Sequence, residues 1–282
     1  MEKIISGRQF DCERALYNLK NSTVESCIFA GPADGESVLK EARDIKVKDS
    51  SFSLRYPMWH VNGFTLENSK MDELCRAALW YCRDGSIWGC DLGGIKAVRE
   101  CENISVKKSR INSCEFGWKS DGISVEDSEI SSEYLFLDSK NVRLNRVKMD
   151  GKYSFQYMEN LEIADSILDT KDAFWHSKNV TVRNCEVKGE YPGWFSDGLT
   201  LIDCKISGTQ PFCYCKNLTL INCTMENCDL SFEYSEVNAD IRGHIDSVKN
   251  PKSGKITADS IGQVIWEDAV TECKCRVSIR SN

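Results

Sequence analysis

Asp138, Asp172 and His176 are the residues in this chain whose types and spacing could support acid–base chemistry. Only three histidines are present, and His176 follows Asp172 by four residues. Asp138 precedes His176 by twice 19 residues, a spacing that recurs along the chain. Carboxylates and a histidine that lie close together are typical of general acid–base catalysis, including the cleavage of glycosidic bonds. We therefore predict Asp138, Asp172 and His176 as the candidate catalytic set.

The spacing of 19 residues is a property of the whole chain. The phrase Asn141-Val142-Arg143-Leu144 recurs as Asn160-Leu161-Glu162-Ile163 and as Asn179-Val180-Thr181-Val182. A fixed short period indicates stacked structural repeats. The first apolar residue of the phrase, here called the anchor, stands at Ile45, Phe64, Gly85, Ile104, Ile123, Val142, Leu161, Val180, Leu199, Leu218 and Val237, with one step of 21 and otherwise steps of 19.

Within each repeat the apolar residues alternate, which is typical of β-strands. The residue before the anchor is usually Asn, Asp or Gly, the types that most easily adopt the left-handed conformation of a tight corner. Leucine-rich repeats would need helical spacing, and a hexapeptide helix would need apolar residues every six positions. The sequence therefore predicts an all-β, single-stranded parallel β-helix of about twelve coils. We expect one domain over 1–282, with an N-terminal cap at 1–21, coils at 22–242 and a C-terminal cap at 243–282.

Composition narrows the class of protein. The 282 residues are 41% hydrophobic and 28% charged, with a net charge of −7. That charge does not favour nucleic acid as a partner, and no run of apolar residues is long enough to cross a membrane. The N-terminal residues lack the apolar stretch of a secretory signal, so we expect a cytoplasmic protein. No motif predicts a cofactor.

The fifteen cysteines are distributed as core residues rather than as disulfide partners. Several stand five residues after an anchor, where other repeats carry serine, so they are expected to fill a narrow part of the core as small apolar side chains. The pairs Cys213-Tyr-Cys215 and Cys273-Lys-Cys275 leave zinc as an alternative, although structural zinc sites usually have two residues between the cysteines. No metal ligand is predicted.

The stretch from Lys216 to Met225, with its Asn-Leu-Thr-Leu-Ile-Asn-Cys phrase, resembles a coil of the right-handed, pectate-lyase-like parallel β-helices. Within that group the chain is similar to an uncharacterised bacterial family known as domain of unknown function 3737. The resemblance covers nearly the whole chain, but it implies a fold and no particular chemistry. Sugar hydrolases of this fold carry clustered aspartates, and Asp121-Gly122 and Asp197-Gly198 look like part of that pattern. Both pairs fall at predicted corners, where Asp-Gly also makes the turn.

The third side of each coil carries large side chains and is the most variable part. We expect a strand there, with alternate residues facing the core and the others forming an exposed aromatic stripe. Such a stripe suits a carbohydrate, because sugar rings pack on aromatic rings and hydrogen-bond at their edges. The alternative is a non-enzymatic scaffold or interaction rod whose stripe is covered by a protein partner or by a second copy in a homo-oligomer. The predicted ligand-binding residues are Tyr134, Phe136, Tyr153, Phe155, Tyr157, Phe174, Phe195, Phe212 and Tyr214.

Overall fold

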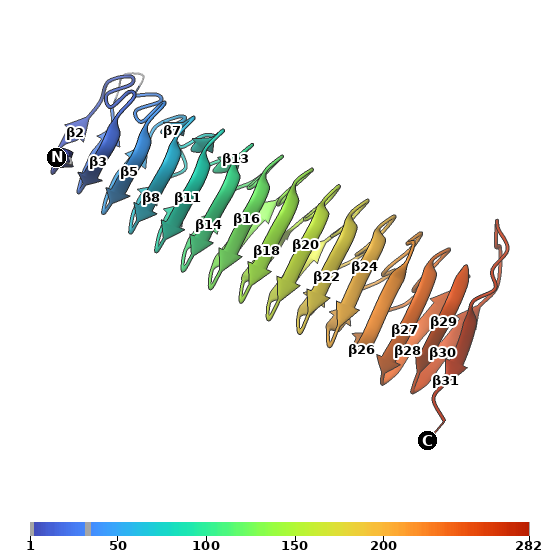
Figure 1. Cartoon of the computed structure of the whole chain (residues 1–282). Coiled ribbons are helices and arrows are strands. Elements are labelled where there is room, and N and C mark those ends of the chain that lie inside the picture. The colour runs from blue at the N-terminus through green and yellow to red at the C-terminus, as the bar shows by residue number, and fades with distance from the viewer. Residues whose placement is uncertain (1–2, 32–34, 282) are drawn as a thin grey trace. The chain divides into compact units, whose positions relative to one another are not determined.

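The computed structural model describes residues 3–31 and 35–281, which form a parallel β-solenoid (Figure 1). Successive coils pair in parallel at a period of about 19 residues, giving about 14 turns. The predicted fold class is therefore confirmed. The chain divides into two compact units, residues 1–143 and 144–282.

One coil of the second unit illustrates the construction. Strand β22 (Lys178–Arg183) forms the first side and β23 (Glu186–Lys188) the second. Val180 and Val182 point inward, and in the next coil Leu199 and Leu201 take the same places in register. Asn184 turns the corner between the two strands in the left-handed conformation, with φ 50°. Its side-chain amide donates to Asp165 of the preceding coil at 2.7 Å, so the corners are hydrogen-bonded along the stack.

The first unit stacks seven coils along one side, and its remaining strands form two narrower sides. In the described part of the predicted N-terminal cap at 1–21, β1 (Lys3–Ser6) and β2 (Gln9–Phe10) pair in parallel with β3 (Lys20–Glu25) and β4 (Ile28–Ala30). That this segment acts as a cap stays a prediction. The first side contains β1 (Lys3–Ser6), β3 (Lys20–Glu25), β5 (Arg43–Lys48), β8 (Asn62–Glu67), β11 (Arg83–Trp88), β14 (Glu102–Lys107) and β16 (Asp121–Glu126). The second side contains β2 (Gln9–Phe10), β4 (Ile28–Ala30), β6 (Ser51–Ser53), β9 (Lys70–Met71), β12 (Asp91–Leu92), β15 (Arg110–Asn112) and β17 (Glu129–Glu133). Among the described residues of this unit, the third side contains the two-residue strands β7 (Met58–Trp59), β10 (Leu79–Trp80) and β13 (Val98–Arg99).

The second unit continues the same plan from β18 (Lys140–Asn145), within which the two units meet in sequence. Its first side contains β20 (Glu159–Ala164), β22, β24 (Asp197–Ile202), β26 (Leu218–Glu226), β27 (Glu236–Arg242), β29 (Ser253–Ala258) and β31 (Arg276–Ile279). Its second side contains β19 (Lys148–Lys152), β21 (Ile167–Lys171), β23, β25 (Lys205–Ser207) and the end of β26. Near the C-terminus, β28 (His244–Lys249) pairs with β30 (Ser260–Ile265) on a separate two-stranded sheet. Within the described part of the predicted C-terminal cap, β29 and β31 continue the first side, and the assignment of residues 243–282 as a cap stays a prediction.

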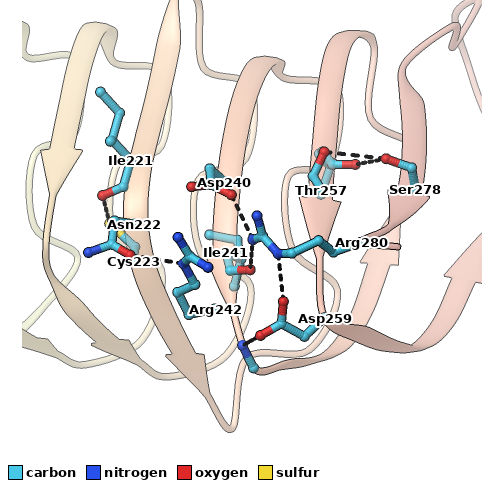
Figure 2. Close-up of polar contacts among 12 residues, drawn as sticks. Ile221, Asn222, Cys223, Asp240, Ile241, Arg242, Thr257, Asp259, Ser278 and Arg280 are labelled. Carbon is cyan, nitrogen blue, oxygen red and sulfur yellow. Dashed lines mark hydrogen bonds and ion pairs between the residues drawn. The ribbon is translucent and has the colours of Figure 1, made fainter. Parts of the chain in front are cut away.

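Arg280 ties the last strands of the second unit together (Figure 2). Its guanidinium donates to Asp240 and Asp259, each at 2.7 Å, and to the carbonyl of Ile241 at 3.0 Å. Asp259 in turn accepts the backbone N–H of Gly243 at 2.7 Å. Because these groups come from three successive levels of the stack, the arginine anchors β31 against the coils before it.

The core is filled by columns of like residues from successive coils. Phe155 and Phe174 stack at 5.2 Å between ring centroids, and both are fully buried. A cysteine column in the second unit, Cys185, Cys204 and Cys223, is at most 4% exposed, as the sequence predicted. The cysteines of this column thus act as small core residues.

No helix in the described ranges is long and apolar enough to span a membrane.

Candidate ligand-binding face

In the second unit the third side of each coil is a turn segment rather than the expected strand. In one coil, Tyr153, Phe155 and Tyr157 all have positive φ, at 58°, 62° and 56°. Adjacent coils still bond here: Tyr157 donates its N–H to the carbonyl of Trp175 at 2.9 Å, and Phe174 donates to Ser154 at 2.9 Å. The alternating left-handed residues change which side chains face inward, so the simple alternation of a strand does not apply.

The consequence is a correction to the predicted aromatic stripe. Phe136, Phe155, Phe174 and Phe212 were expected on the surface, but all four are fully buried. They occupy the middle position of the turn segment, which points into the core. Because a buried ring cannot contact a ligand, these four residues do not belong to a binding face.

Two residues after the middle position of successive turns lies a column of rings, here called the ring column: Tyr157, His176, Phe195, Tyr214 and Tyr234. The middle residue is a buried phenylalanine in four of these turns and Gly193 in the turn of Phe195; Tyr234 is half-buried, and the other four rings are exposed. Tyr157 is 55% exposed and Phe195 42% exposed. The ring centroids of successive members lie 5.1, 5.0, 4.8 and 5.5 Å apart, and the first four rings are within 11° of parallel. One aromatic side chain per coil is therefore exposed through four coils, and the half-buried Tyr234 extends the column into a fifth.

The spacing of the coils decides which part of each ring is presented. Carbon atoms in contact lie about 3.5–4.0 Å apart, whereas the centroids of His176 and Phe195 lie 5.0 Å apart. Parallel rings at this separation touch only when they are offset, as aromatic pairs prefer. The ring column therefore presents mainly the edges of its rings, which carry the positive part of the ring quadrupole.

Two tryptophans that the predicted ligand-binding set did not include lie beside the ring column. Trp175 and Trp194 stack at 5.5 Å with an interplanar angle of 5°, and both are only half-buried. Their indole N–H groups donate to the carbonyls of Tyr191 and Gln210, each at 2.9 Å. The sequence did contain a signal for this position, because tryptophan also stands at the equivalent place of earlier repeats, at Trp59 and Trp118. With Tyr191 edge-on to Trp194 at 5.5 Å, the aromatic face is two side chains wide.

Tyr134 and Tyr153 precede the buried phenylalanines by two residues. Tyr153 is half-buried in the second unit. Tyr134 belongs to the first unit, where it is 37% exposed and its carbonyl accepts the indole N–H of Trp118 at 2.7 Å. The second unit thus brings together Tyr157, Phe195 and Tyr214 from the predicted set, with Tyr153 in the same coil as Tyr157.

The predicted catalytic residues have unlike environments. Asp138 is exposed in the first unit. Asp172 is 5% exposed, and burial raises the pKa of its carboxyl above the ordinary value, with Glu190 acting in the same direction and Lys171 opposing it. His176 is exposed at its edge but lies between the rings of Tyr157 and Phe195. Within the described ranges no hydrogen bond joins Asp172 to His176, so their side chains do not form an acid–base pair in this arrangement.

The first unit carries a polar arrangement at the corresponding places. His60 Nδ1 lies 3.1 Å from Glu41, and its ring meets Tyr81 edge-on at 5.1 Å. Tyr81 hydrogen-bonds to Glu100, which raises the pKa of the Tyr81 hydroxyl, and Arg99 donates to the same carboxylate at 2.9 Å. These groups satisfy one another, unlike the aromatic face of the second unit.

No three His, Cys, Asp or Glu residues in the described parts of the chain are placed to hold a metal ion. Cys213 and Cys215 are buried, and the Cys215 thiol points to the carbonyl of Gly193 at 3.0 Å. Cys273 points to the carbonyl of Asn250 at 3.2 Å. The two cysteine pairs therefore engage different backbone groups and do not form a four-thiolate site.

The coils and the exposed aromatic face define a parallel β-solenoid whose distinctive surface is one of ring edges. The chain belongs to the family described as "Protein of unknown function (DUF3737)", whose model matches residues 3–278. No curated protein matches the sequence.

Among solved structures, the chain is similar to the A-module of Azotobacter vinelandii mannuronan C-5 epimerase AlgE6. Identity is 12%, the TM-score is 0.43, and the alignment covers 98% of this chain and 89% of that one. A tailspike protein mutant of E. coli bacteriophage HK620 in complex with a pentasaccharide is 8% identical with a TM-score of 0.44, covering 93% of this chain and 60% of the tailspike. The periplasmic alginate epimerase AlgG is 8% identical with a TM-score of 0.36, covering 94% and 77% of the two chains.

Proposed function

We propose that this protein binds a glycan along the aromatic face of its second unit. The observation that carries the proposal is the ring column, in which four nearly parallel rings from successive coils are exposed along their edges. A face that repeats once per coil suits a ligand that also repeats along its length. A linear glycan is such a ligand, because each sugar unit offers C–H groups and hydroxyl oxygens at regular intervals.

The chemistry of the face supports a sugar ligand. Tyr157, His176 and Tyr214 combine an apolar ring with a polar edge group, as binding sites for amphipathic ligands do. The positive ring edges favour the oxygen atoms of hydroxyl groups, and the half-exposed indoles of Trp175 and Trp194 add apolar area for C–H contacts.

The charges around the face favour an uncharged glycan over a polyanion. Lys171 and Glu190 on one flank form an ion pair at 2.9 Å. At the C-terminal end Lys249 pairs with Glu233 at 2.9 Å. Because these cations are already neutralised by carboxylates one coil away, the face offers no concentrated positive field for an acidic polymer.

The test is binding of neutral and acidic oligosaccharides to the full chain, measured by calorimetry and by thermal shift. A variant with Tyr157→Ala, Phe195→Ala and Tyr214→Ala should bind at least tenfold more weakly, since each lost aromatic contact is worth about 0.5–1.5 kcal/mol. Tyr17→Ala is the matched control, because Tyr17 is 54% exposed and belongs to the first unit rather than to the ring column.

Equal losses in the control variant, or undiminished binding by the triple variant, would place the glycan elsewhere. If no sugar binds and the triple variant instead changes the mass of the particle in solution, the face is a protein interface. That outcome would support the scaffold alternative and reject the glycan proposal.

A further inference from the structure

The first coil has a strand edge and an apolar end that no other described residue covers. Strand β1 pairs on one side only, with β3. Phe10 in the same coil stacks on Phe29 at 5.2 Å and remains half-exposed, with the Arg8 guanidinium over it at 5.4 Å. One level further in, Phe29 is fully buried between its neighbours. The first coil therefore exposes the kind of surface that every interior coil buries.

The direction of the backbone groups on this edge follows from the hydrogen bonds of the neighbouring strand. Glu25 points its carbonyl back at the first coil, where it accepts the N–H of Gly7 at 3.0 Å. Ser6 is the register partner of Glu25, so its backbone groups point the same way, out of the stack. Because successive residues of a strand alternate, Ile4 also directs its N–H and C=O outward. These are unpaired groups of an open strand edge.

A second open edge among the described residues belongs to β31, the last strand of the second unit. Ala258 points its carbonyl at this strand and accepts the N–H of Arg280 at 2.7 Å. Ile279 is the register partner of Ala258, so its backbone groups, and those of Val277, point away from the stack. Arg280 holds this edge in place through Asp240 and Asp259 (Figure 2). Among the described residues β31 pairs with β29 alone.

These two edges are complementary in hydrogen bonding. In β31 the outward N–H and C=O groups include those of Val277, whose side chain occupies an inward position. In β1 the outward groups belong to Ile4 and Ser6, the residues on either side of the inward-facing Ile5. Two successive coils inside the stack pair through the same alternation. Ile5 and Val277 occupy equivalent inward positions, since Ile5 pairs in register with Val24 and Val277 with Ile256. A parallel pairing of β31 with β1 of another molecule would continue both the ladder and the core column.

We propose that this protein associates head to tail, with β31 of one copy pairing in parallel with β1 of the next. Such a contact joins different surfaces of the two copies, so association continues beyond a dimer into a ring or a filament. The inference concerns the two ends of the solenoid and is independent of the glycan face.

The test blocks one edge at a time. Proline is tolerated on an edge strand but cannot donate an N–H and hinders a further strand. Ile4→Pro blocks the head and Ile279→Pro blocks the tail, at residues of similar exposure, 64% and 62%. Ile4→Val and Ile279→Val keep the backbone N–H and serve as controls. Circular dichroism and thermal unfolding first establish that all four variants fold like the wild type.

Light scattering and sedimentation over a range of concentrations then report the mass. We expect wild type and both valine variants to form species larger than dimers, and each proline variant alone to remain monomeric. An equimolar mixture of the two proline variants should form dimers, because it supplies one free head and one free tail. A wild type that stays monomeric at all concentrations would overturn the proposal. An Ile279→Pro variant that still dimerises would also overturn it, since that result requires head-to-head contact.

Discussion

Replacing Phe174 by alanine tests the inward orientation of the middle residue of each turn. The ring is fully buried and stacks on Phe155 at 5.2 Å. A buried aromatic side chain removes about 150–250 Å² from water, which at about 25 cal/mol per Å² corresponds to about 4–6 kcal/mol. Alanine keeps a small part of that area, and measured losses for such truncations are about 3–5 kcal/mol. We expect a loss of that size.

His176→Ala is the matched control, because it lies two residues away in the same turn and is exposed. Its loss should stay below about 1 kcal/mol. For a chain of this size each kcal/mol lowers the melting temperature by roughly 2–4 °C, so calorimetry should show a drop of roughly 6–20 °C for Phe174→Ala and a small one for His176→Ala. Equal drops, or a larger one for His176→Ala, would refute the assigned orientation.

Three further perturbations follow from individual side chains. Burial raises the pKa of Asp172 above its ordinary 3.8, so the folded state holds this proton more tightly than the unfolded state and loses stability as pH rises above that value. Asp172→Asn should therefore stabilise the protein at pH 7 but not at pH 3 in denaturant titrations, and an equal gain at both pH values would contradict this reasoning. Of the fifteen cysteines, the exposed Cys12 and Cys114 should react at once with a thiol reagent, and the half-buried Cys273 should react more slowly. The twelve buried thiols should react only in denaturant. Rapid modification of more than three thiols in the folded protein would argue against the core assignment. Arg280→Gln should speed amide hydrogen exchange in β31 and leave the first unit unchanged, and unaltered exchange in β31 would show that the arginine does not anchor it.

The strands and corners of each coil could be predicted from the sequence, because the first two sides of the coil follow the ordinary alternation of β-strands. The anchors and the residues two positions later alternate with polar residues, and Val180 and Val182 are buried as that alternation requires. Asn and Gly before the anchors turn corners in the left-handed conformation, as Asn179 does at φ 53° and Gly198 at φ 75°. The expectation of one continuous domain stays a prediction.

The third side could not be predicted from residue types, because it departs from their ordinary preferences. Phe155, Tyr157 and Phe174 have positive φ, a conformation that is a genuine outlier for bulky side chains. No sequence rule assigns it to aromatic residues. The turn is held by hydrogen bonds from both neighbouring coils, as when Phe174 donates to Ser154 and Tyr157 donates to Trp175. A strained backbone conformation persists only where several surrounding interactions hold it in place. Here those interactions come from the adjacent coils.

This backbone also explains why the aromatic face arises where it does. In a β-strand one of any two neighbouring residues faces the core, but in these turns Trp175 and His176 are adjacent in sequence and both reach the surface. A coil can therefore present two neighbouring side chains while its middle residue, Phe174 in this turn, packs in the core. The first unit uses the same two positions for Trp59 and His60, and there His60 pairs with Glu41. Since the inward residue carries the packing, the outward pair is free to differ between coils, so differences in binding should arise from these paired positions.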